Sequence, residues 1–285
     1  MSPPVIEADL HLHSYHSDGL FSPADVVRRA SEAGLKAIAL TDHDTVAGLA
    51  EARAAAPAGF GIISAIELSS VFRGREIHLL AYQIDPEDQR LAELLEPLRQ
   101  ERALRAERIV ARLNKLGIGV TMDEVHAIAR AARVGPAPSL GRPHVAEAIV
   151  RHGAARDMDD AFIKFLRRGQ PAYVGKACVT VERAADVIRA NGGVLMVAHP
   201  ALNLSDADTE ALAAAWLDGV EVWHPKHDRD QVERLERLTR RLGLIASGGS
   251  DYHGPGRSHH EIAAAGVSLQ TVSRIREIAQ LRARG

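Results

Sequence analysis

The sequence predicts an α/β fold in which a parallel sheet of about seven strands closes into a barrel-like structure. Short apolar, strand-like runs alternate with amphipathic, helix-like runs along most of the chain, as expected when helices connect parallel strands. The 285 residues are 46% hydrophobic, which is enough for one sizeable core. Residues that can bind metal ions follow several of the strands, and in a barrel they would meet at one rim.

The strand-like runs are short and rich in aliphatic residues. About seven of them in a chain of this length favour one closed sheet over two separate domains. The runs are VIEADLHLH (5–13), KAIALTDHD (36–44), GIISAIELSS (61–70), EIHLLAYQI (76–84), GVLMVAHP (193–200), GVEVWHP (219–225) and GLIASGGSDYH (243–253).

Helix-like runs lie between most of these strands, and one more follows the last of them. Ser22 before Pro23 and Asp44 before Thr45 are typical of helix starts. The predicted helices cover residues 23–33, 45–56, 181–191, 206–217, 229–242 and 269–283. Each would connect two strands or, in the last case, end the chain.

Residues 87–169 interrupt the alternation with helical periodicity alone. Pro97 is expected to split the first part of this region into two helices, because an interior proline loses a hydrogen bond and clashes with the preceding turn. Further helices are predicted at residues 122–131, 143–151 and 158–166. The sequence therefore predicts a discontinuous barrel, residues 1–86 and 170–285, with residues 87–169 as a helical insertion that caps the active site.

Composition excludes several classes of function. The chain has 35 basic and 37 acidic residues and a formal net charge of −2, so a surface that coats duplex DNA is not expected. The apolar runs are too short to span a bilayer, and the N-terminal residues do not resemble a signal peptide. Cys178 is the single cysteine, which excludes an intramolecular disulfide. These features predict a cytoplasmic protein without membrane partners.

The segment ADLHLHSYHSDG, residues 8–19, is dense in metal-binding side chains. His11 and His13 are two residues apart, so a strand directs them to the same face, and Asp18 follows in the loop. Adjacent imidazoles pack poorly in a core and bind metal ions well. Taken alone, a polar strand end explains these residues equally well.

Similar residues lie at or near the C-terminal ends of other predicted strands, except His78, which lies within the fourth, and this distribution favours the metal site. Because the C-terminal ends of parallel barrel strands form one rim, we expect these side chains to meet there. The residues are His43, Glu67, His78, His199, Asp251 and His253.

Together the motifs DLHLHSYHSDG, LTDHD, IEL, IHLLAY, AHP and GSDYH resemble the PHP (polymerase and histidinol phosphatase) superfamily of metal-dependent phosphoesterases. The insertion, with GRPHVAEAIV and GQPAYVGK, is similar to that of nucleoside 3′,5′-bisphosphate phosphatases and a related RNA 5′-end exonuclease. The resemblance implies a distorted seven-stranded (β/α) barrel. It also implies two or three metal ions, Mn²⁺ first, with Fe²⁺ or Zn²⁺ as alternatives.

The resemblance further implies which residues hold each ion. His11, His13, Glu67 and Asp251 would bind one; Glu67, His78 and His199 a second; Asp18, His43 and His253 a third. Mixed imidazole and carboxylate ligands suit Mn, Fe or Zn, and the lack of thiolates disfavours softer metals. The reaction implied is attack of a metal-activated hydroxide on phosphorus. His16, Asp44 and His224 are candidates for proton transfer or for supporting the ligands.

Substrate contacts are predicted on the loops over the rim. Pro143 fits the first turn of a helix, so Arg142 and His144 would stand at a helix N-terminus, which favours a phosphate. Lys176 could reach the same ligand, and His224 could contact a phosphate or a nucleobase. A second anion site beside the metals predicts a substrate with two phosphates, such as the nucleoside 3′,5′-bisphosphate pAp, losing its 3′-phosphate.

Other readings remain open at this point. The same site could trim short RNA from its 5′ end, hydrolyse a cyclic phosphodiester, or act as an AMP phosphatase. A non-catalytic metal-binding module is the least favoured, because the ligand set is complete. The near-neutral net charge counts against long polyanions, which usually need a basic track.

Overall fold

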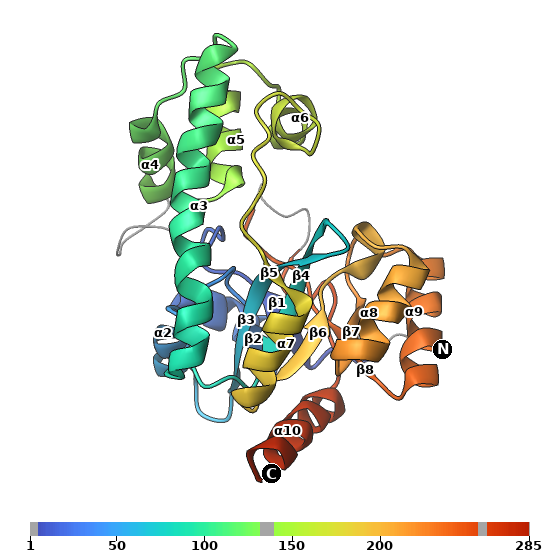
Figure 1. Ribbon diagram of the computed structural model, residues 1–285. Helices are drawn as coiled ribbons and strands as arrows, with labels where there is room; N and C mark the ends of the chain where they lie inside the picture. The colour runs from blue at the N-terminus through green and yellow to red at the C-terminus, as the bar shows by residue number, and fades with distance from the viewer. Residues whose placement is uncertain (1–4, 132–139, 256–260, 285) are drawn as a thin grey trace.

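The computed structural model of the protein describes residues 5–131, 140–255 and 261–284. A barrel-like sheet forms one part, and a group of helices projects from one side of it (Figure 1). The long helix α3 (Gln89–Lys115) runs along the barrel and continues into the helical group. Residues 132–139 of the predicted insertion lie outside the described residues.

One nearly closed sheet connects the described strands in the order β1-β2-β3-β4-β6-β7-β8, with β5 paired to β3. Isolated bridges from Leu12 to Tyr252 and from Ala8 to Val267 narrow the gap between β1 and β8. The predicted fold class is confirmed. The strands are β1 (Ala8–Leu12), β2 (Ala37–Leu40), β3 (Gly61–Phe72), β4 (Arg75–Tyr82), β5 (Val179–Thr180), β6 (Val194–Val197), β7 (Gly219–Trp223) and β8 (Ile245–Gly248).

Strand β4 runs antiparallel to both β3 and β6, so the prediction of an all-parallel sheet was wrong at this strand. Arg73 and Gly74 join β3 to β4 with φ angles of 49° and 73°, which are typical of a tight hairpin turn. Because no helix crosses over here, β4 begins at the rim where the parallel strands end. His78, which pairs with Ser69, therefore reaches that rim from the first half of its strand.

Most helices follow the predicted pattern, and several begin with a side-chain cap. Ser22 Oγ accepts the Asp25 N–H at 2.9 Å in front of Pro23. Other bounds are α1 (Pro23–Glu32), α2 (Leu49–Ala55), α4 (Met122–Ala131), α5 (Arg142–Arg151), α6 (Met158–Ala161), α7 (Val181–Ala190), α8 (Asp206–Trp216), α9 (Arg229–Leu242) and α10 (Leu269–Arg284). The described residues also form two short helical turns, the π-helix η1 (Phe162–Leu166) and the 3₁₀-helix η2 (Pro200–Leu202).

Pro97 does not split helix α3, which corrects the sequence prediction. Leu91, Leu94, Leu95 and Leu98 lie on both sides of the proline and are all buried against the barrel. Burying each leucine contributes about 1.5–3 kcal/mol. Together they outweigh the roughly 3 kcal/mol that an interior proline costs a helix.

Two other predicted helices differ in extent. Helix α2 begins at Leu49, later than the predicted Thr45. Asp44 does not cap it, because the Asp44 carboxylate accepts the backbone N–H of Ser69 at 2.7 Å and its hydroxyl at 2.5 Å. The helix predicted at residues 158–166 is α6 followed by the π-helical turn η1.

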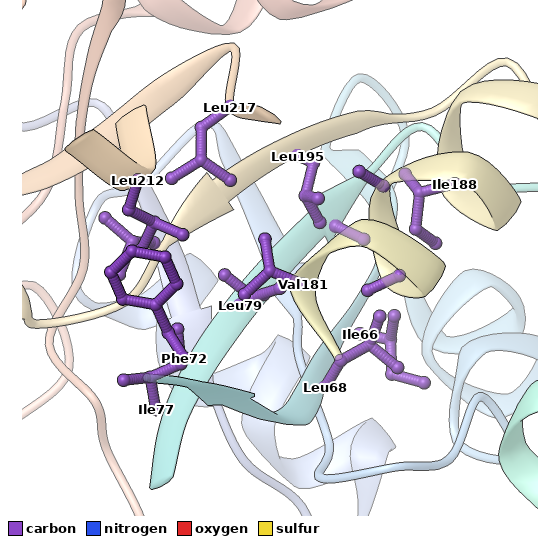
Figure 2. Packing of buried hydrophobic residues seen from close by; sticks show 14 of the residues in the cluster. Ile66, Leu68, Phe72, Ile77, Leu79, Val181, Ile188, Leu195, Leu212 and Leu217 are labelled. Carbon is purple, nitrogen blue, oxygen red and sulfur yellow. The ribbon is translucent and has the colours of Figure 1, made fainter. Parts of the chain in front are cut away.

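Strand alternation separates an outer apolar layer from the barrel interior. Ile66 and Leu68 of β3 and Leu79 of β4 point outward and pack under α7 and α8 (Figure 2). Leu80, next along β4, points inward and packs with the other interior side chains. Ile275 of helix α10 packs against these interior side chains. The helix covers the end of the barrel opposite the rim where the parallel strands end.

Replacing Leu79 with alanine should lower the free energy of unfolding by about 2–5 kcal/mol, because the side chain is fully buried and leaves a cavity. The control is Leu281→Ala, since Leu281 is 66% exposed and should change stability by no more than about 0.5 kcal/mol. Urea unfolding in the presence of a chelator measures both variants without a contribution from bound metal. Similar effects at the two positions would contradict this assignment of the core.

The helical group has its own apolar core. Ile109 and Leu113 of α3 pack there against α4 and α5, through residues such as Val125 and Val145. The first half of α3 belongs instead to the barrel core through Leu91 and its neighbours. One helix thus contributes to both cores and connects them.

Candidate metal centre

Glu67 lies at the middle of the histidine-rich rim. Its neighbours Ile66 and Leu68 pack outside the barrel, so strand alternation directs the Glu67 carboxylate inward. Ala65 and Ile63 lie below it in the barrel interior. The carboxylate is therefore buried above a closed apolar floor, and is only 1% exposed.

One oxygen of this carboxylate faces three histidines. Glu67 Oε2 lies 3.2 Å from Nε2 of His11 and 3.2 Å from Nε2 of His13. It also lies 3.1 Å from Nδ1 of His43. His11 of β1 and His13, which follows the end of that strand, share a face as predicted, with ring centroids 5.1 Å apart.

The other oxygen faces the remaining strands of the rim. Glu67 Oε1 lies 2.8 Å from Nδ1 of His78 and 3.3 Å from Nε2 of His199. His78 belongs to β4, and His199 follows the end of β6, directly before η2. A single carboxylate thus lies between both sets of histidines and would supply a ligand oxygen to metal ions bound by either set.

Asp251 and Asp18 supply carboxylates on either side of His13. Asp251 Oδ1 lies 3.4 Å from Nε2 of both His11 and His13. Asp18 Oδ1 lies 3.2 Å from Nε2 of His253, and its Oδ2 lies 3.8 Å from Nε2 of His43. Asp18 follows β1 and Asp251 follows β8, and these two strands are neighbours where the barrel closes.

The candidate ligand atoms fall into overlapping groups, within each of which all atoms lie within 4.8 Å of one another. All nine residues suggested as ligands by the sequence motifs occur in these groups. Their division among particular ions stays a prediction. The groups are His13, Asp18, His43 and His253; His11, His13 and Asp251; His11, Glu67 and His199; and His43, Glu67 and His78.

The carboxylates of the cluster are held in their ionised form. Burial alone would raise the pKa of Glu67, but the imidazoles of His43, His78 and His11 lower it well below its usual range. Burial likewise opposes ionisation of Asp251, whose pKa is nevertheless lowered well below normal by His11 and His253. Ionised carboxylates are the form that binds a metal ion.

The histidines divide into two groups. Burial lowers the pKa of His43 well below its usual value and also lowers that of His78, so both favour the neutral, ligating form. Burial would lower the pKa of His13 too, but the nearby Asp251 and Glu67 carboxylates raise it to about 9. The carboxylates of Asp251 and Glu67 thus stabilise positive charge beside His13.

Unsatisfied polar atoms indicate what this cluster is built to hold. Among the described residues, Nε2 of His11 and His13, Nδ1 of His43 and His78, and Oε2 of Glu67 are buried and make no hydrogen bond. Leaving such atoms without partners costs about 1–3 kcal/mol each. Divalent metal ions coordinated by imidazole nitrogen and carboxylate oxygen would satisfy them, so the residues fit a multi-metal site.

The backbone around the cluster is unusual at several points. His199 and Asp251 are in the left-handed region, with φ angles of 30° and 52°. Non-glycine residues rarely adopt this conformation, and it is common at functional sites. Gly249 approaches His11 so closely that a Cβ would lie 2.4 Å from the His11 amide nitrogen, so the approach requires glycine. Asp42 braces the loop after β1 by accepting the Ser14 N–H at 2.8 Å.

A cavity of about 110 Å³ lies between the cluster and the helical group. Asp18, His43 and His78 form part of its wall on the cluster side. Arg142 at the start of α5 and Lys176 line it as well, so the structure brings both predicted cations to the same place. This volume is several times the space that a single water molecule needs.

Two further cations line this cavity that the sequence analysis missed, Arg102 and Arg105 of α3. The Arg102 guanidinium is 9% exposed, donates to the backbone oxygen of His43 at 3.2 Å, and lies 3.5 Å from Asp18 Oδ2. Burial lowers the pKa of Arg105 to about 10. Its Nε donates to the Val174 oxygen at 2.9 Å, while its buried Nη2 makes no hydrogen bond among the described residues.

The other two predicted substrate contacts are buried. His144 does not line this cavity in the part of the chain that the structure describes; its Nδ1 accepts the Gly141 N–H at 3.1 Å at the start of α5. His224 Nε2 lies 3.4 Å from Asp251 Oδ2, beside the cluster, and His224 Nδ1 accepts the Lys226 N–H at 3.1 Å. Their roles toward a substrate stay predictions.

Comparisons with known proteins agree with this site. The sequence profile of the PHP domain matches residues 9–127. A 3′,5′-nucleoside bisphosphate phosphatase of Chromobacterium violaceum is 35% identical over 261 residues, 89% of this chain and 90% of that protein. The 5′-3′ exoribonuclease Rnm of Escherichia coli is 35% identical over 255 residues, 87% of this chain and 85% of that protein.

The similarity extends to three-dimensional structure. A crystal structure assigned to a metal-dependent phosphoesterase of Bifidobacterium adolescentis has a TM-score of 0.88 and 31% identity, covering 97% of this chain and 98% of that one. The nearly closed α/β barrel with clustered histidines and carboxylates on its rim, together with the similarity to these proteins, identifies a metal-dependent phosphoesterase. The chain belongs to the PHP family. Within the described residues, every helix is too short or too polar to cross a bilayer.

Proposed function

We propose that the protein removes the 3′-phosphate from nucleoside 3′,5′-bisphosphates such as pAp. The observation that carries this proposal is the cavity lined by four cations, Arg102, Arg105, Arg142 and Lys176, directly beside the metal cluster. The cluster would hold the phosphate that reacts, and the cations would hold the one that does not. Two anion sites side by side suit a substrate with two phosphates on one sugar.

The charges in the cavity support an anion as the ligand. Asp44 Oδ2 lies 3.4 Å from Lys176 Nζ and 3.7 Å from an Arg102 nitrogen, so these two cations share a buried carboxylate. Arg105 and Arg142 form no ion pair with the described residues. They leave surplus positive charge in the cavity, and an arginine fork matches phosphate oxygens well.

The cluster residues account for the chemical step. Metal ions bound by the grouped histidines and carboxylates, Mn²⁺ being the expected one, would act as Lewis acids toward phosphoryl oxygens and would lower the pKa of water. The protein residues supply the ligand atoms and exclude bulk water from a buried carboxylate centre. His224 keeps its proton on Nε2, because its Nδ1 accepts a backbone N–H, and it can donate that proton beside Asp251.

Exoribonuclease activity is the second candidate, and the same cavity supports it. A site for the 5′-phosphate binds that group whether the 3′ oxygen carries a phosphate or the next nucleotide. The similarity to the Escherichia coli exoribonuclease is as high as the similarity to the bisphosphate phosphatase. A cyclic phosphodiester or AMP would leave one of the two anion sites unused, which disfavours both.

Residues 87–169 are proposed to act as the cap of this active site, since α3 and α5 supply Arg102, Arg105 and Arg142 to its wall. The helical group would then determine the substrate while the barrel carries the metal ions. Phosphate release from pAp, compared with shortening of a 5′-phosphorylated oligoribonucleotide in Mn²⁺, tests the proposed function. Higher kcat/KM on the oligoribonucleotide would favour the exonuclease instead.

Arg142→Ala should raise KM for pAp by about 10- to 100-fold, which corresponds to losing one charge-assisted hydrogen bond of about 1.5–3 kcal/mol. Metal content should stay unchanged, because Arg142 is not among the grouped ligands. Steady-state kinetics and metal analysis of the purified variant measure the two quantities. Arg151→Ala, at the other end of α5 and paired with Glu147, is the matched control. An unchanged KM in Arg142→Ala would remove Arg142 from the site.

A further inference from the structure

A buried carboxylate outside the predicted ligand set lies directly behind the cluster. Glu221 of β7 is 0% exposed, and its neighbours Val220 and Val222 pack outside the barrel, so its side chain points inward. Glu221 Oε1 lies 2.9 Å from Nδ1 of His11, and Oε2 accepts the backbone N–H of His199 at 2.6 Å. One carboxylate thus contacts two candidate ligands from different strands.

The contact with His11 determines which ring nitrogen is available. A carboxylate accepts hydrogen bonds, so His11 donates to it from Nδ1–H. His11 Nε2 is then left with a bare lone pair, 3.2 Å from Glu67 Oε2 and 3.4 Å from Asp251 Oδ1. This is the nitrogen that has to bind the metal ion, and its direction is fixed by the bond on the far side of the ring.

The contact with His199 supports a strained backbone. His199 has φ 30° and ψ 52°, a left-handed conformation that costs a non-glycine residue of the order of 1–3 kcal/mol. The short hydrogen bond from its N–H to Glu221 holds the chain in this turn. As a result His199 Nε2 lies 3.3 Å from Glu67 Oε1.

We infer that Glu221 is a positioning residue that sets the affinity of the metal ion held by His11, Glu67 and His199. It would act through the ring direction of His11 and the backbone of His199. Glu221 contacts His11 and His199, and neither belongs to the group of His13, Asp18, His43 and His253, so an ion bound by that group should not depend on it. The inference concerns metal binding and holds whichever phosphate ester is the substrate.

Glutamine is an informative substitute because it keeps the size and loses one acceptor. If its amide oxygen accepts the His199 N–H, its NH₂ group faces His11 Nδ1 and can only donate to it. His11 would then carry its proton on Nε2, where the metal ion must bind. Aspartate keeps two acceptor oxygens on a shorter stem, so Glu221→Asp should bind metal better than Glu221→Gln.

Direct metal titration tests this inference. Metal-free protein is titrated with Mn²⁺ against a competing chelator, and bound ions are counted by mass spectrometry. Glu221→Gln should weaken one bound ion by about 10- to 100-fold, the usual loss when the partner of a ligating histidine is removed. Any ion at His13, Asp18, His43 and His253 should keep its affinity. Glu221→Asp should recover part of the loss.

Asp218→Asn is the matched control, since Asp218 is a partly buried carboxylate just before β7 that pairs with Arg282 at the far end of the barrel. It should leave Mn²⁺ binding unchanged. If Glu221→Gln does not fold, ¹H–¹⁵N spectra of the wild-type protein with Zn²⁺ still test the tautomer, with His11→Gln used to assign the signal. Equal Mn²⁺ binding by Glu221→Gln and wild type, or a proton on Nε2 of His11, would overturn the inference.

Discussion

Glu67→Ala should lower kcat/KM for phosphate ester hydrolysis by several orders of magnitude. The Glu67 carboxylate lies within 3.3 Å of five histidine nitrogens, which belong to four strands or to the segments directly after them, so its removal takes a shared ligand from the cluster. It would also leave several imidazoles facing one another in a buried site. Initial rates with Mn²⁺ and a phosphate ester, together with the metal content of the variant, measure the effect.

Asp251→Ala should be nearly as severe, because Asp251 contacts both His11 and His13. Chelation of the wild-type protein should abolish hydrolysis, and Mn²⁺ should restore it. Glu93→Ala, an exposed carboxylate on α3, is the control and should retain full activity. Full activity of Asp251→Ala in the presence of a chelator would rule out the metal mechanism.

The clustering of candidate ligands could be predicted because strand geometry is local. An HxH pair in a strand shares a face, and the parallel strands of a barrel end at one rim. His43 and Glu67 follow this logic and lie 3.1 Å apart. His78 satisfied the prediction for a different reason, since its strand is antiparallel. The turn residues Arg73 and Gly74 carried a hairpin signal that the β–α alternation concealed.

Arg102 and Arg105 could not be recognised in the sequence because nothing local distinguishes them. Helix α3 carries other arginines, such as Arg99 and Arg108, which are exposed and pair with nearby glutamates. Only the phase of the helix relative to the barrel turns Arg102 and Arg105 toward the cavity. That phase depends on the tertiary packing of the leucines around Pro97, where the sequence prediction of a helix break failed.

The balanced net charge of the chain hides a local concentration of positive charge. Several surface arginines pair with acidic partners, as Arg73 does with Asp208 and Arg241 with Glu210. The cations beside the cluster are instead gathered around a small cavity, where Arg102 and Arg105 are buried and Arg142 and Lys176 are half-buried. This distribution favours recognition of one terminal phosphate over binding along a polyanion, which needs an extended basic track. It is consistent with a mononucleotide or the end of a short RNA.

The preference of the enzyme for a second phosphate should disappear in the double variant Arg142→Ala, Lys176→Ala. The substrates to compare are pAp and 3′-AMP, which share the scissile 3′-phosphate and differ in the 5′-phosphate. The wild-type enzyme should have a much higher kcat/KM on pAp, because the anchored phosphate aligns the reacting one. Each lost charge-assisted contact is worth about 1.5–3 kcal/mol, so the double variant should lose about 10²- to 10⁴-fold on pAp.

Activity on 3′-AMP provides the internal control for this experiment, since it requires the metal cluster and not the cation-lined cavity. It should change little in the double variant, so that the two substrates converge. Arg151→Ala combined with Lys164→Ala removes two exposed cations from the same helical group and should preserve the preference. Equal loss on both substrates would indicate damage to the cluster through Asp44, the buried partner of Lys176. A wild-type enzyme that hydrolyses 3′-AMP or a cyclic phosphate as efficiently as pAp would contradict the two-phosphate substrate itself.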